Sequence, residues 1–385
     1  MSRPDFDVVV VGGRVAGAAT AMLLARRGAR VLVVERSRRG SDTLSTHALL
    51  RPGVVQMRRW GLLAALDATG TPAITTSTFH YGAETVHVTL RPVHDTHALY
   101  APRRTVLDPL LLDAAEHDGV EVVDRATVTG LVRADDGRVR GVEVEHAGRR
   151  RRVTAPMVVG ADGIRSTVAA AVGARPLALG LSAGTCVYGY VHGRVTEGFE
   201  WFYGAGLTSG LIPTDAGQTL AFVCRPAATP FAPPTTWPQL ISLVHKAWPA
   251  GADMLAGGVP DGRLRRYRGA VGYRRRAHGP GWALVGDAGY YVDPLSSHGM
   301  SQALRDAELL ARALTSGHVA AALVDYERRR DDLSAPIACA VESIAAFDWD
   351  ERTVRPRVLA MTSAMSDEVE ALARLDEACL PATSW

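Results

Sequence analysis

Cysteine, lysine and long apolar runs are scarce in this sequence of 385 residues. The four cysteines lie far apart and form no C-x-x-C pair, so the sequence suggests neither a zinc site nor a disulfide framework, and free thiols are expected. They are Cys186, Cys224, Cys339 and Cys379. No apolar stretch approaches the roughly 18 residues of a membrane span, and the N-terminus leads directly into an apolar strand instead of forming a signal peptide. We therefore expect a cytoplasmic protein that has no membrane span and binds no metal.

The positive charge comes almost entirely from arginine, because Lys246 is the only lysine. The formal net charge is +3, which is weak support for a polyanionic partner, and we expect no binding to nucleic acid. The densest basic run, residues 149–152, lies between two expected strands and is interpreted as a solvated hairpin turn. The composition, with 47% hydrophobic and 22% charged residues, is typical of a globular protein that is long enough for two domains.

The first forty residues contain the motif around which the chain is organised. A short apolar strand, residues 6–11, runs into a glycine-bearing turn, and small and apolar residues then recur at helical spacing over residues 16–27. A second apolar strand, residues 31–34, ends in Glu35. Such a strand-turn-helix-strand unit places a dinucleotide pyrophosphate at the helix N-terminus and a ribose hydroxyl on a carboxylate about twenty residues further on.

The glycine fingerprint of this unit is incomplete. Gly12, Gly13 and Gly17 lie in the turn, but Arg14 occupies the position of the middle glycine of a G-x-G-x-x-G pattern. A guanidinium at that position can contact phosphate directly. On its own the incomplete motif is equally compatible with a plain buried βαβ unit, so its function depends on the motifs found elsewhere in the chain.

The chain as a whole predicts an α/β fold: a Rossmann-like domain that is interrupted by an inserted antiparallel sheet and followed by C-terminal helices. Residues 1–174 alternate between strands and helices, and residues 175–278 contain alternating, aromatic-bearing strands typical of an antiparallel sheet. A short apolar strand and a long helix in residues 279–330 resume the first domain. Residues 331–385 are helical in pattern. We expect the inserted block to form a second domain that binds a small-molecule substrate.

Two further turns follow buried strands and carry an acidic residue beside a glycine. Arginines also stand at the start of two expected helices: Arg51 before an amphipathic helix over residues 54–66, and Arg104 before a helix whose leucines face inward. The residues singled out in the two turns are Asp162 and Gly163 in the first, and Gly286, Asp287, Pro294, Gly299 and Met300 in the second.

Together, the three separated motifs resemble the single-component FAD-dependent monooxygenases of the para-hydroxybenzoate hydroxylase type and their relatives, the geranylgeranyl-reductase-like flavoproteins. The resemblance extends from residue 8 to about residue 314. It implies a bound FAD, with Glu35 at the adenosine ribose, Asp287 at the ribityl chain and Arg51 at the pyrophosphate. The candidate FAD-binding residues are Gly12, Gly13, Arg14, Gly17, Glu35, Arg36, Arg51, Arg104, Asp162, Gly163, Gly286, Asp287, Pro294, Gly299 and Met300.

The same resemblance implies the reaction. NAD(P)H binds transiently and reduces the flavin, which reacts with O2 to a C4a-hydroperoxide that hydroxylates an aromatic or polyketide-like small molecule. The helix that begins near Gly299 is expected to stabilise the reduced, anionic flavin through its dipole. The sequence departs from the family pattern beside the flavin, where Ser297 replaces a glycine, Ser301 an asparagine and Tyr290 a histidine.

The substrate is expected between the flavin and the inserted sheet. His47 and His298 lie within motifs that approach the flavin ring, and they are candidate catalytic proton relays near neutral pH. Each can equally be a structural histidine that hydrogen bonds to the backbone. The candidate substrate-lining residues are aromatic or imidazole side chains of the inserted block, for which ordinary core packing is the alternative. They are Tyr188, Tyr190, His192, Trp201 and Tyr203.

Other functions are also compatible with the sequence. The altered positions beside the flavin leave room for a reductase that transfers hydride to an isoprenoid double bond, and a non-redox, FAD-containing cyclase is a third alternative. Flavin-dependent halogenation is disfavoured, because the sequence has no W-x-W-x-I-P stretch and its only lysine, Lys246, lies on an expected helix of the inserted block. The C-terminal helices are expected either to cap the substrate chamber or to form a dimer interface.

Overall fold

The predicted strand-turn-helix-strand unit forms the centre of a six-stranded sheet in the computed structural model, which describes residues 3–193, 196–204, 206–229, 232–256 and 258–377. Strand β1 (Val8–Val11) leads into helix α1 (Val15–Ala25), and β2 (Val31–Val34) pairs with β1 in parallel. The strand order is β17-β18-β9-β1-β2-β5, parallel throughout except for the edge strand β17. The other strands are β5 (Glu121–Val123), β9 (Met157–Gly160), β17 (His278–Gly279) and β18 (Trp282–Leu284).

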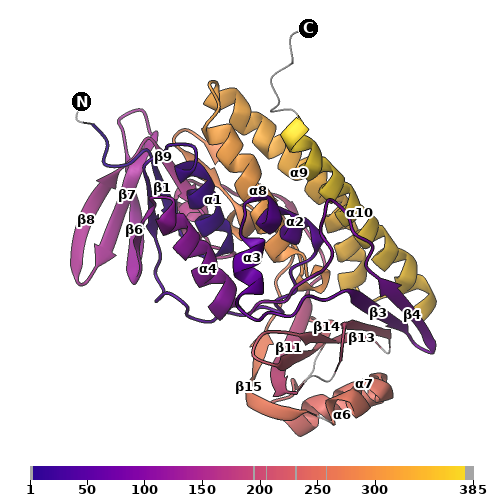
Figure 1. Cartoon of the computed structure of the whole chain (residues 1–385). Helices are drawn as coiled ribbons and strands as arrows, with labels where there is room; N and C mark the ends of the chain where they lie inside the picture. The colour runs from indigo at the N-terminus through magenta and orange to yellow at the C-terminus, as the bar shows by residue number, and fades with distance from the viewer. Residues whose placement is uncertain (1–2, 194–195, 205, 230–231, 257, 378–385) are drawn as a thin grey trace.

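Alternating side chains along β1 divide its valines between two layers. Val8 and Val10 pack with the helices α1, α4 (Arg104–His117) and α8 (Gly299–Leu314). Val9 and Val11 pack with an antiparallel sheet of three strands, which lies near the N-terminus in Figure 1. Its strands are β6 (Ala126–Arg133), β7 (Val139–His146) and β8 (Arg149–Thr154). The interpretation of residues 149–152 as a turn is wrong: they pair with β7, and the turn is made by Ala147 and Gly148, both with positive φ.

The inserted block forms most of a seven-stranded sheet with the order β15-β11-β14-β13-β12-β3-β4. Its own strands are β11 (Gly184–His192), β12 (Phe199–Gly204), β13 (Leu207–Pro213), β14 (Gln218–Pro226) and β15 (Val259–Tyr267). The other two, β3 (Thr76–Tyr81) and β4 (Glu84–Thr89), come from the first part of the chain, and β3 pairs with β12 in parallel. The sheet therefore extends beyond the predicted block 175–278, because β3 covers the backbone edge that β12 would otherwise expose.

Each face of the seven-stranded sheet is covered by a pair of helices. Helices α6 (Trp237–Ala247) and α7 (Pro249–Leu255), from the inserted block, pack on one face. The C-terminal helices α9 (Val319–Ala345) and α10 (Glu351–Glu377) pack against aromatic side chains of the other face, and Figure 1 shows them side by side along one flank. The predicted boundary after residue 330 falls inside α9, because this helix continues unbroken from the first domain to the sheet.

Shorter elements connect these layers. The helix predicted over residues 54–66 forms as two helices, α2 (Arg51–Arg59) and α3 (Leu63–Asp67), because Gly61 between them has a φ of +75°. A third antiparallel sheet has the order β10-β16-β19. The remaining elements are α5 (Thr167–Ala171), β10 (Pro176–Leu179), β16 (Tyr273–Arg275), β19 (Tyr290–Tyr291) and the 3-10 turns η1 (Gly286–Ala288) and η2 (Pro294–Ser296).

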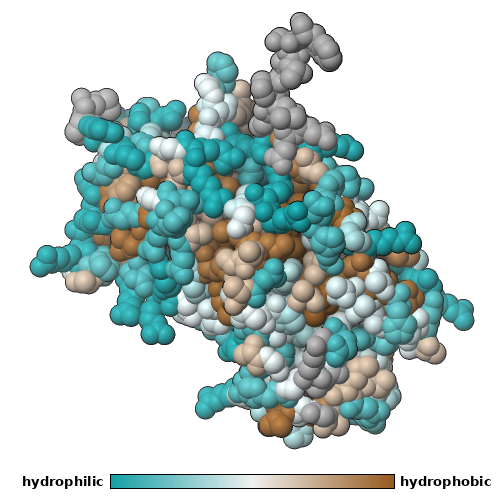
Figure 2. All heavy atoms as spheres, in the orientation of Figure 1, coloured by the Kyte–Doolittle hydropathy of each residue, from teal (hydrophilic) through white to brown (hydrophobic). Residues whose placement is uncertain are grey.

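Hydrophilic side chains dominate the face of the molecule that Figure 2 shows, with apolar side chains interspersed. Among the described residues, no helix has both the length and the apolar character needed to cross a bilayer, and no cluster of three or more His, Cys, Asp or Glu residues is arranged to hold a metal ion. Cys186 and Cys224 are buried free thiols at paired positions of β11 and β14, and Cys339 is an exposed one. Cys379 lies outside the described residues.

The turn between β1 and α1 is packed too closely for side chains at two of its glycines. Gly12 has a φ of +102°, and a Cβ atom there would lie 2.5 Å from the backbone oxygen of Ala161. A Cβ atom on Gly17 would lie 1.8 Å from the backbone oxygen of Gly12. Since both obstacles are backbone atoms, no side-chain rotation relieves these contacts. The glycines therefore bring the first turn against the turn that follows β9.

Substitution Gly17→Ala should destabilise this region strongly, because the added methyl group collides with a backbone carbonyl. We expect the free energy of unfolding to fall by about 2 kcal/mol or more, measured by urea unfolding. The matched control is Gly317→Ala, where a Cβ atom meets nothing within 4 Å and φ is not positive. Equal stability of the two variants would contradict the packing described here.

Candidate functional site

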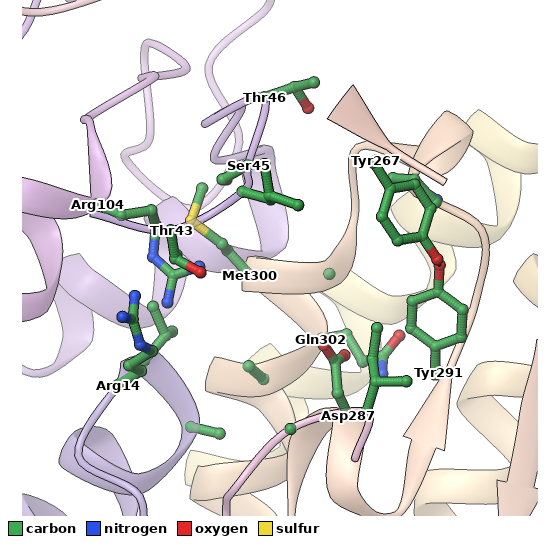
Figure 3. Close-up of a pocket in the computed structure, with 18 of the residues that line it drawn as sticks. Arg14, Thr43, Ser45, Thr46, Arg104, Tyr267, Asp287, Tyr291, Met300 and Gln302 are labelled. Atoms are coloured by element: carbon green, nitrogen blue, oxygen red, sulfur yellow. The ribbon is translucent and has the colours of Figure 1, made fainter. Parts of the chain in front are cut away.

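One cavity of about 660 Å³ extends from the carboxyl edge of the six-stranded sheet to the seven-stranded sheet. Parallel strands end at a common edge, so the turns after β1, β9 and β18 meet there. Gly12, Asp162 and Asp287, one from each of these turns, all line the cavity. Asp287 is labelled in Figure 3. The three motifs found in the sequence are thus brought together in space. The predicted FAD-binding residues that line the cavity are Gly12, Arg14, Glu35, Arg36, Arg104, Asp162, Gly163, Asp287, Pro294, Gly299 and Met300.

The first turn presents a carboxylate to the cavity. Glu35 is buried, and its two carboxylate oxygens accept hydrogen bonds from the backbone N–H groups of Gly13 and Ser37, each at 2.7 Å. These bonds fix the orientation of the carboxylate at the end of β2. A carboxylate can accept about four hydrogen bonds, so Glu35 retains acceptor capacity for a hydroxyl group in the cavity.

Two arginines share one buried carboxylate beside this turn. Arg104 binds Asp108 through two hydrogen bonds, from Nε to Oδ1 at 2.7 Å and from Nη2 to Oδ2 at 3.1 Å. Arg14 donates from Nη1 to Oδ2 of the same residue at 3.2 Å. Figure 3 shows the two guanidinium groups close together at the cavity. Because one negative charge faces two positive ones, this part of the cavity is suited to an anionic group such as a pyrophosphate.

The acidic residues of the other two turns differ in their surroundings. Asp162 accepts hydrogen bonds from Ser166 Oγ at 2.6 Å and from the N–H of Thr167 at 2.6 Å, so its carboxylate holds the start of α5. The carboxylate of Asp287 has no hydrogen-bond partner among the described residues, and burial raises its pKa to about 6. Asp287 is therefore the acid with the most capacity to bind a ligand hydroxyl.

The start of α8 forms another wall of the cavity, through Gly299 and Met300. The residue before this helix has no side-chain cap, and its first turn carries no acidic side chain, so the positive end of the helix dipole is not neutralised by either. Ser297 has a φ of +52°, a left-handed conformation, at the position where the resemblance expects glycine. The backbone path is thus the one that glycine favours, although the side chain differs.

Gln302 on the same helix is a cavity residue that the sequence interpretation missed. Its Nε2 donates to the backbone oxygen of Tyr290 at 2.8 Å, whereas its Oε1 has no partner among the described residues. Figure 3 places this side chain beside Asp287. The signal available in the sequence was its position one helical turn after the predicted flavin-facing glycine. The substituted family positions Ser301 and Tyr290 do not line the cavity.

The seven-stranded sheet closes the other end of the cavity with its aromatic face. Of the candidate substrate-lining residues, Tyr188, Trp201 and Tyr203 lie in the cavity wall. Side chains at alternate positions of one strand share a face, and this explains why further residues of β11 and β14 join them. The lining residues of this end that the sequence interpretation missed are Cys186, Thr208, Ser209, Phe222, Cys224, Tyr267 and Tyr291.

His47 lies in the cavity wall, but it does not titrate as the relay hypothesis expects. Its backbone has a φ of +66°, its Nε2 is hydrogen bonded to the hydroxyl of Tyr190, and its Nδ1 has no partner among the described residues. Burial, with a contribution from the positive charge of Arg104, lowers the pKa of His47 to about 3. The ring is therefore neutral at physiological pH, and it does not change its charge near neutrality.

His298 does not reach the cavity. It is buried between helices, with its Nε2 2.7 Å from the carboxylate of Glu368 on α10. Burial by itself would raise the pKa of Glu368, but His298 and Arg305 bring it below its ordinary value. Arg305 in turn pairs with Asp306 at 2.7 Å. The group of His298, Arg305, Asp306 and Glu368 joins α8 to α10, and the predicted position of His298 at the flavin is not observed.

Several other predicted residues also lie outside the cavity lining. Arg51 donates from Nη2 to the backbone oxygen of Arg91 at 2.9 Å, and His192 is exposed with its Nε2 3.6 Å from Asp261. Tyr190 lies behind the wall, where it contacts two lining residues, His47 and Tyr188. The predicted site residues that do not line the cavity are Gly13, Gly17, Arg51, Tyr190, His192, Gly286 and His298.

Comparison with known proteins agrees with this architecture. A family model described as an FAD binding domain matches residues 5–339. The chain is 27% identical over 338 residues to the menaquinone reductase of Mycolicibacterium smegmatis, covering 81% of this chain and 77% of that protein. It is 31% identical over 190 residues to the aklavinone 12-hydroxylase DnrF of Streptomyces peucetius, covering 45% of this chain and 38% of that protein.

Solved structures show the same fold. The structure of P. aeruginosa PqsL in complex with 2-aminobenzoylacetate superposes with a TM-score of 0.77 at 22% identity, covering 92% of this chain and 99% of that chain. The structure of the flavin-dependent brominase Bmp2 superposes with a TM-score of 0.76 at 19% identity, covering 97% and 99%. These similarities confirm the predicted α/β fold with several sheets and C-terminal helices.

The position of Arg104 at the cavity predicts a loss of FAD affinity in Arg104→Met. Removal of a cation from the anion-binding end should raise the dissociation constant for FAD by roughly 10- to 100-fold, measured by flavin fluorescence titration. The matched control is Arg51→Met, which removes an arginine that binds Arg91 outside the cavity. We expect Arg51→Met to stay within about 3-fold of the unaltered chain, and a reversed order of the two variants would contradict the assignment.

The low pKa of His47 predicts how stability depends on pH. In the unfolded chain the ring accepts a proton below about pH 6.5, whereas the folded ring remains neutral down to about pH 3, so protonation favours unfolding as the pH falls through this window. Between pH 7.5 and pH 5, His47 should reduce the free energy of unfolding by about 2 kcal/mol.

The variant His47→Asn should lose that much less stability over the same pH interval, because asparagine does not titrate and tolerates the left-handed backbone. The measurement is urea unfolding at both pH values with a fixed, saturating concentration of FAD. Identical pH dependence in the two proteins would disprove the low pKa.

Proposed function

Because the chain belongs to the FAD binding domain family, we propose that it is an NAD(P)H-consuming monooxygenase that hydroxylates an aromatic or polyketide-like small molecule. Membership of this family makes the chain an FAD-dependent oxidoreductase. The observation that carries the proposal is a shared cavity, in which a cradle for a dinucleotide and an uncharged aromatic wall face the same space. A flavin held in the cradle would lie next to a substrate held against the sheet.

The residues of the cradle fit FAD in both charge and space. Arg14 and Arg104 would bind the pyrophosphate, Glu35 the adenosine ribose and Asp287 a hydroxyl group of the ribityl chain. The carboxylate of Asp287 supports this assignment, because it is a cavity acid without a partner among the described residues. Gly12 supports it as well, because only glycine allows the tight turn here: a Cβ atom would lie 2.5 Å from the backbone oxygen of Ala161.

When bound, FAD would supply hydride transfer from NAD(P)H and the activation of O2. The protein's own contribution is orientation and the control of water and charge. The N-terminus of α8, at Gly299, directs the positive end of a helix dipole at the cavity and would stabilise negative charge there. Tyr188 fixes the loop that carries His47, because its hydroxyl accepts the backbone N–H of Ser45 at 3.1 Å. This contact holds the loop against the seven-stranded sheet.

The neutral ring of His47 can hold a proton at only one of its two ring nitrogens. The hydrogen bond between Nε2 and the hydroxyl of Tyr190 selects which nitrogen carries it. Its Nδ1, without a partner among the described residues, would then be available to exchange a hydrogen bond with a substrate hydroxyl. We infer that His47 is a positioning residue for the substrate or loop instead of an acid with a near-neutral pKa.

The comparisons support two related reactions. The similarity to an aklavinone hydroxylase, although restricted to 45% of the chain, supports hydroxylation of a polyketide-like ring. The similarity to a menaquinone reductase extends over 81% of the chain and favours a reductase as the second candidate. The sequence alternative of an isoprenoid double bond as the hydride acceptor belongs to this candidate. Halogenation through a lysine is disfavoured, because Lys246 is exposed on α6, on the sheet face opposite the cavity.

The decisive experiment measures NADPH oxidation, NADH oxidation and oxygen uptake by the FAD-loaded protein with a panel of phenols and polyketide aglycones. We expect a substrate to stimulate oxygen uptake by roughly 10-fold or more and to gain one oxygen atom from 18O2. Turnover under anaerobic conditions, with two hydrogen atoms added to the substrate, would instead identify the reductase. A flavin that neither NADPH nor NADH reduces would refute both reactions and favour the non-redox cyclase.

A further inference from the structure

Charge is distributed unevenly along the cavity. All of its charged lining residues come from the turns that follow β1, β2, β9 and β18 or from the start of α4. The lining residues contributed by the seven-stranded sheet are aromatic, thiol-bearing or hydroxyl-bearing, and none of them is charged. Charge is thus concentrated where the dinucleotide would bind, and the end closed by the sheet is neutral.

Several charged groups that lie beside this neutral end, outside the cavity lining, are already paired. Asp42 binds Arg265 at 2.5 Å and Arg103 at 3.4 Å, and both guanidinium groups lie over the ring of Tyr190, behind the cavity wall. The buried carboxylate of Asp293 accepts the backbone N–H groups of Gly184 and Leu295. None of these charged residues belongs to the cavity lining.

Two side chains at the neutral end have polar groups that the protein leaves without partners. The hydroxyl of Tyr203 makes no hydrogen bond to any described residue, and Oγ1 of Thr208, the residue opposite it on β13, is buried without a partner among them. The ring of Tyr203 is held by Tyr81, with centroids 5.6 Å apart, and by Trp349 at 6.3 Å. Burial raises the pKa of Tyr203 above its ordinary value, so its hydroxyl group stays protonated and can donate a hydrogen bond.

We propose that the end of the cavity closed by the sheet binds an uncharged, ring-bearing substrate through an oxygen atom that meets the hydroxyls of Tyr203 and Thr208, and that it rejects aromatic carboxylates. A carboxylate placed there would lose its hydration without gaining a cation as a partner. A phenol, quinone or ester would lose far less hydration free energy. The inference deepens the proposed function by naming the substrate class, and it rests on that function only for the reaction that follows binding.

The test compares three ligands on the same ring system: 2-naphthol, 6-hydroxy-2-naphthoate and the methyl ester of the latter. Each is titrated into the oxidised, FAD-loaded protein without NADPH, and the dissociation constant is measured by calorimetry. We expect the carboxylate to bind roughly 100-fold more weakly than its ester, which is larger but neutral. Equal binding of the acid and the ester, or no binding of any of the three, would overturn the proposal.

A conservative pair of variants tests the hydroxyl contact. Tyr203→Phe should weaken binding of 2-naphthol by about 10-fold, because one buried hydrogen bond is lost. Tyr81→Phe removes the same atom from the neighbouring stacked ring, which does not line the cavity, and should change binding by less than about 2-fold. If both variants bind 2-naphthol like the unaltered protein, Tyr203 does not contact the ligand. The variant Thr208→Val must then show the 10-fold loss of binding. If it does not, the proposed polar contact is disproved.

These measurements use the oxidised protein, so they are independent of turnover. A protein that prefers neutral ligands but consumes no oxygen would support the substrate class and refute the monooxygenase. A protein that hydroxylates an aromatic carboxylate would support the monooxygenase and refute the substrate class.

Discussion

The parallel alignment of β1, β9 and β18 is the constraint on which the rest of the structure depends. Neighbouring parallel strands release their chains at one edge, so turns from distant parts of the sequence must meet there. Gly12 and Gly17 make the meeting close, because side chains at these positions would collide with backbone atoms. The cavity forms at this junction, where Arg14 and the start of α8 contribute to its lining.

Polar groups are used in two distinct ways around the cavity. Asp108, Glu35 and Asp162 are bonded by neighbouring donors and hold the turns in position. Asp287, Thr208 and Gln302 retain groups without partners among the described residues, although each lines the cavity. A buried polar group without a hydrogen-bond partner reduces the stability of the folded chain. The best explanation of such groups is therefore that they contact a bound molecule.

The C-terminal helices are part of the site's support. Glu368 of α10 contacts both His298 and Arg305 near the start of α8. A buried charge cluster of this kind is strongly destabilised when one partner is removed, so it fixes the register between the two helices.

Left-handed backbone at Ser297 and His47 occurs on either side of the cavity, and such conformations persist only where the surrounding packing imposes them.

By itself the sequence determined the βαβ unit, the three turn motifs and the alternating aromatic face, because each depends on local periodicity or on glycine conformations that neighbouring residues dictate. Most of the candidate FAD-binding residues that it predicted line the cavity. Only the tertiary structure decided that β3 joins the inserted sheet, that Arg51 binds Arg91 and that His298 faces α10. Those outcomes depend on packing between segments far apart in the chain, and a local pattern contains no information about which distant group a side chain will meet.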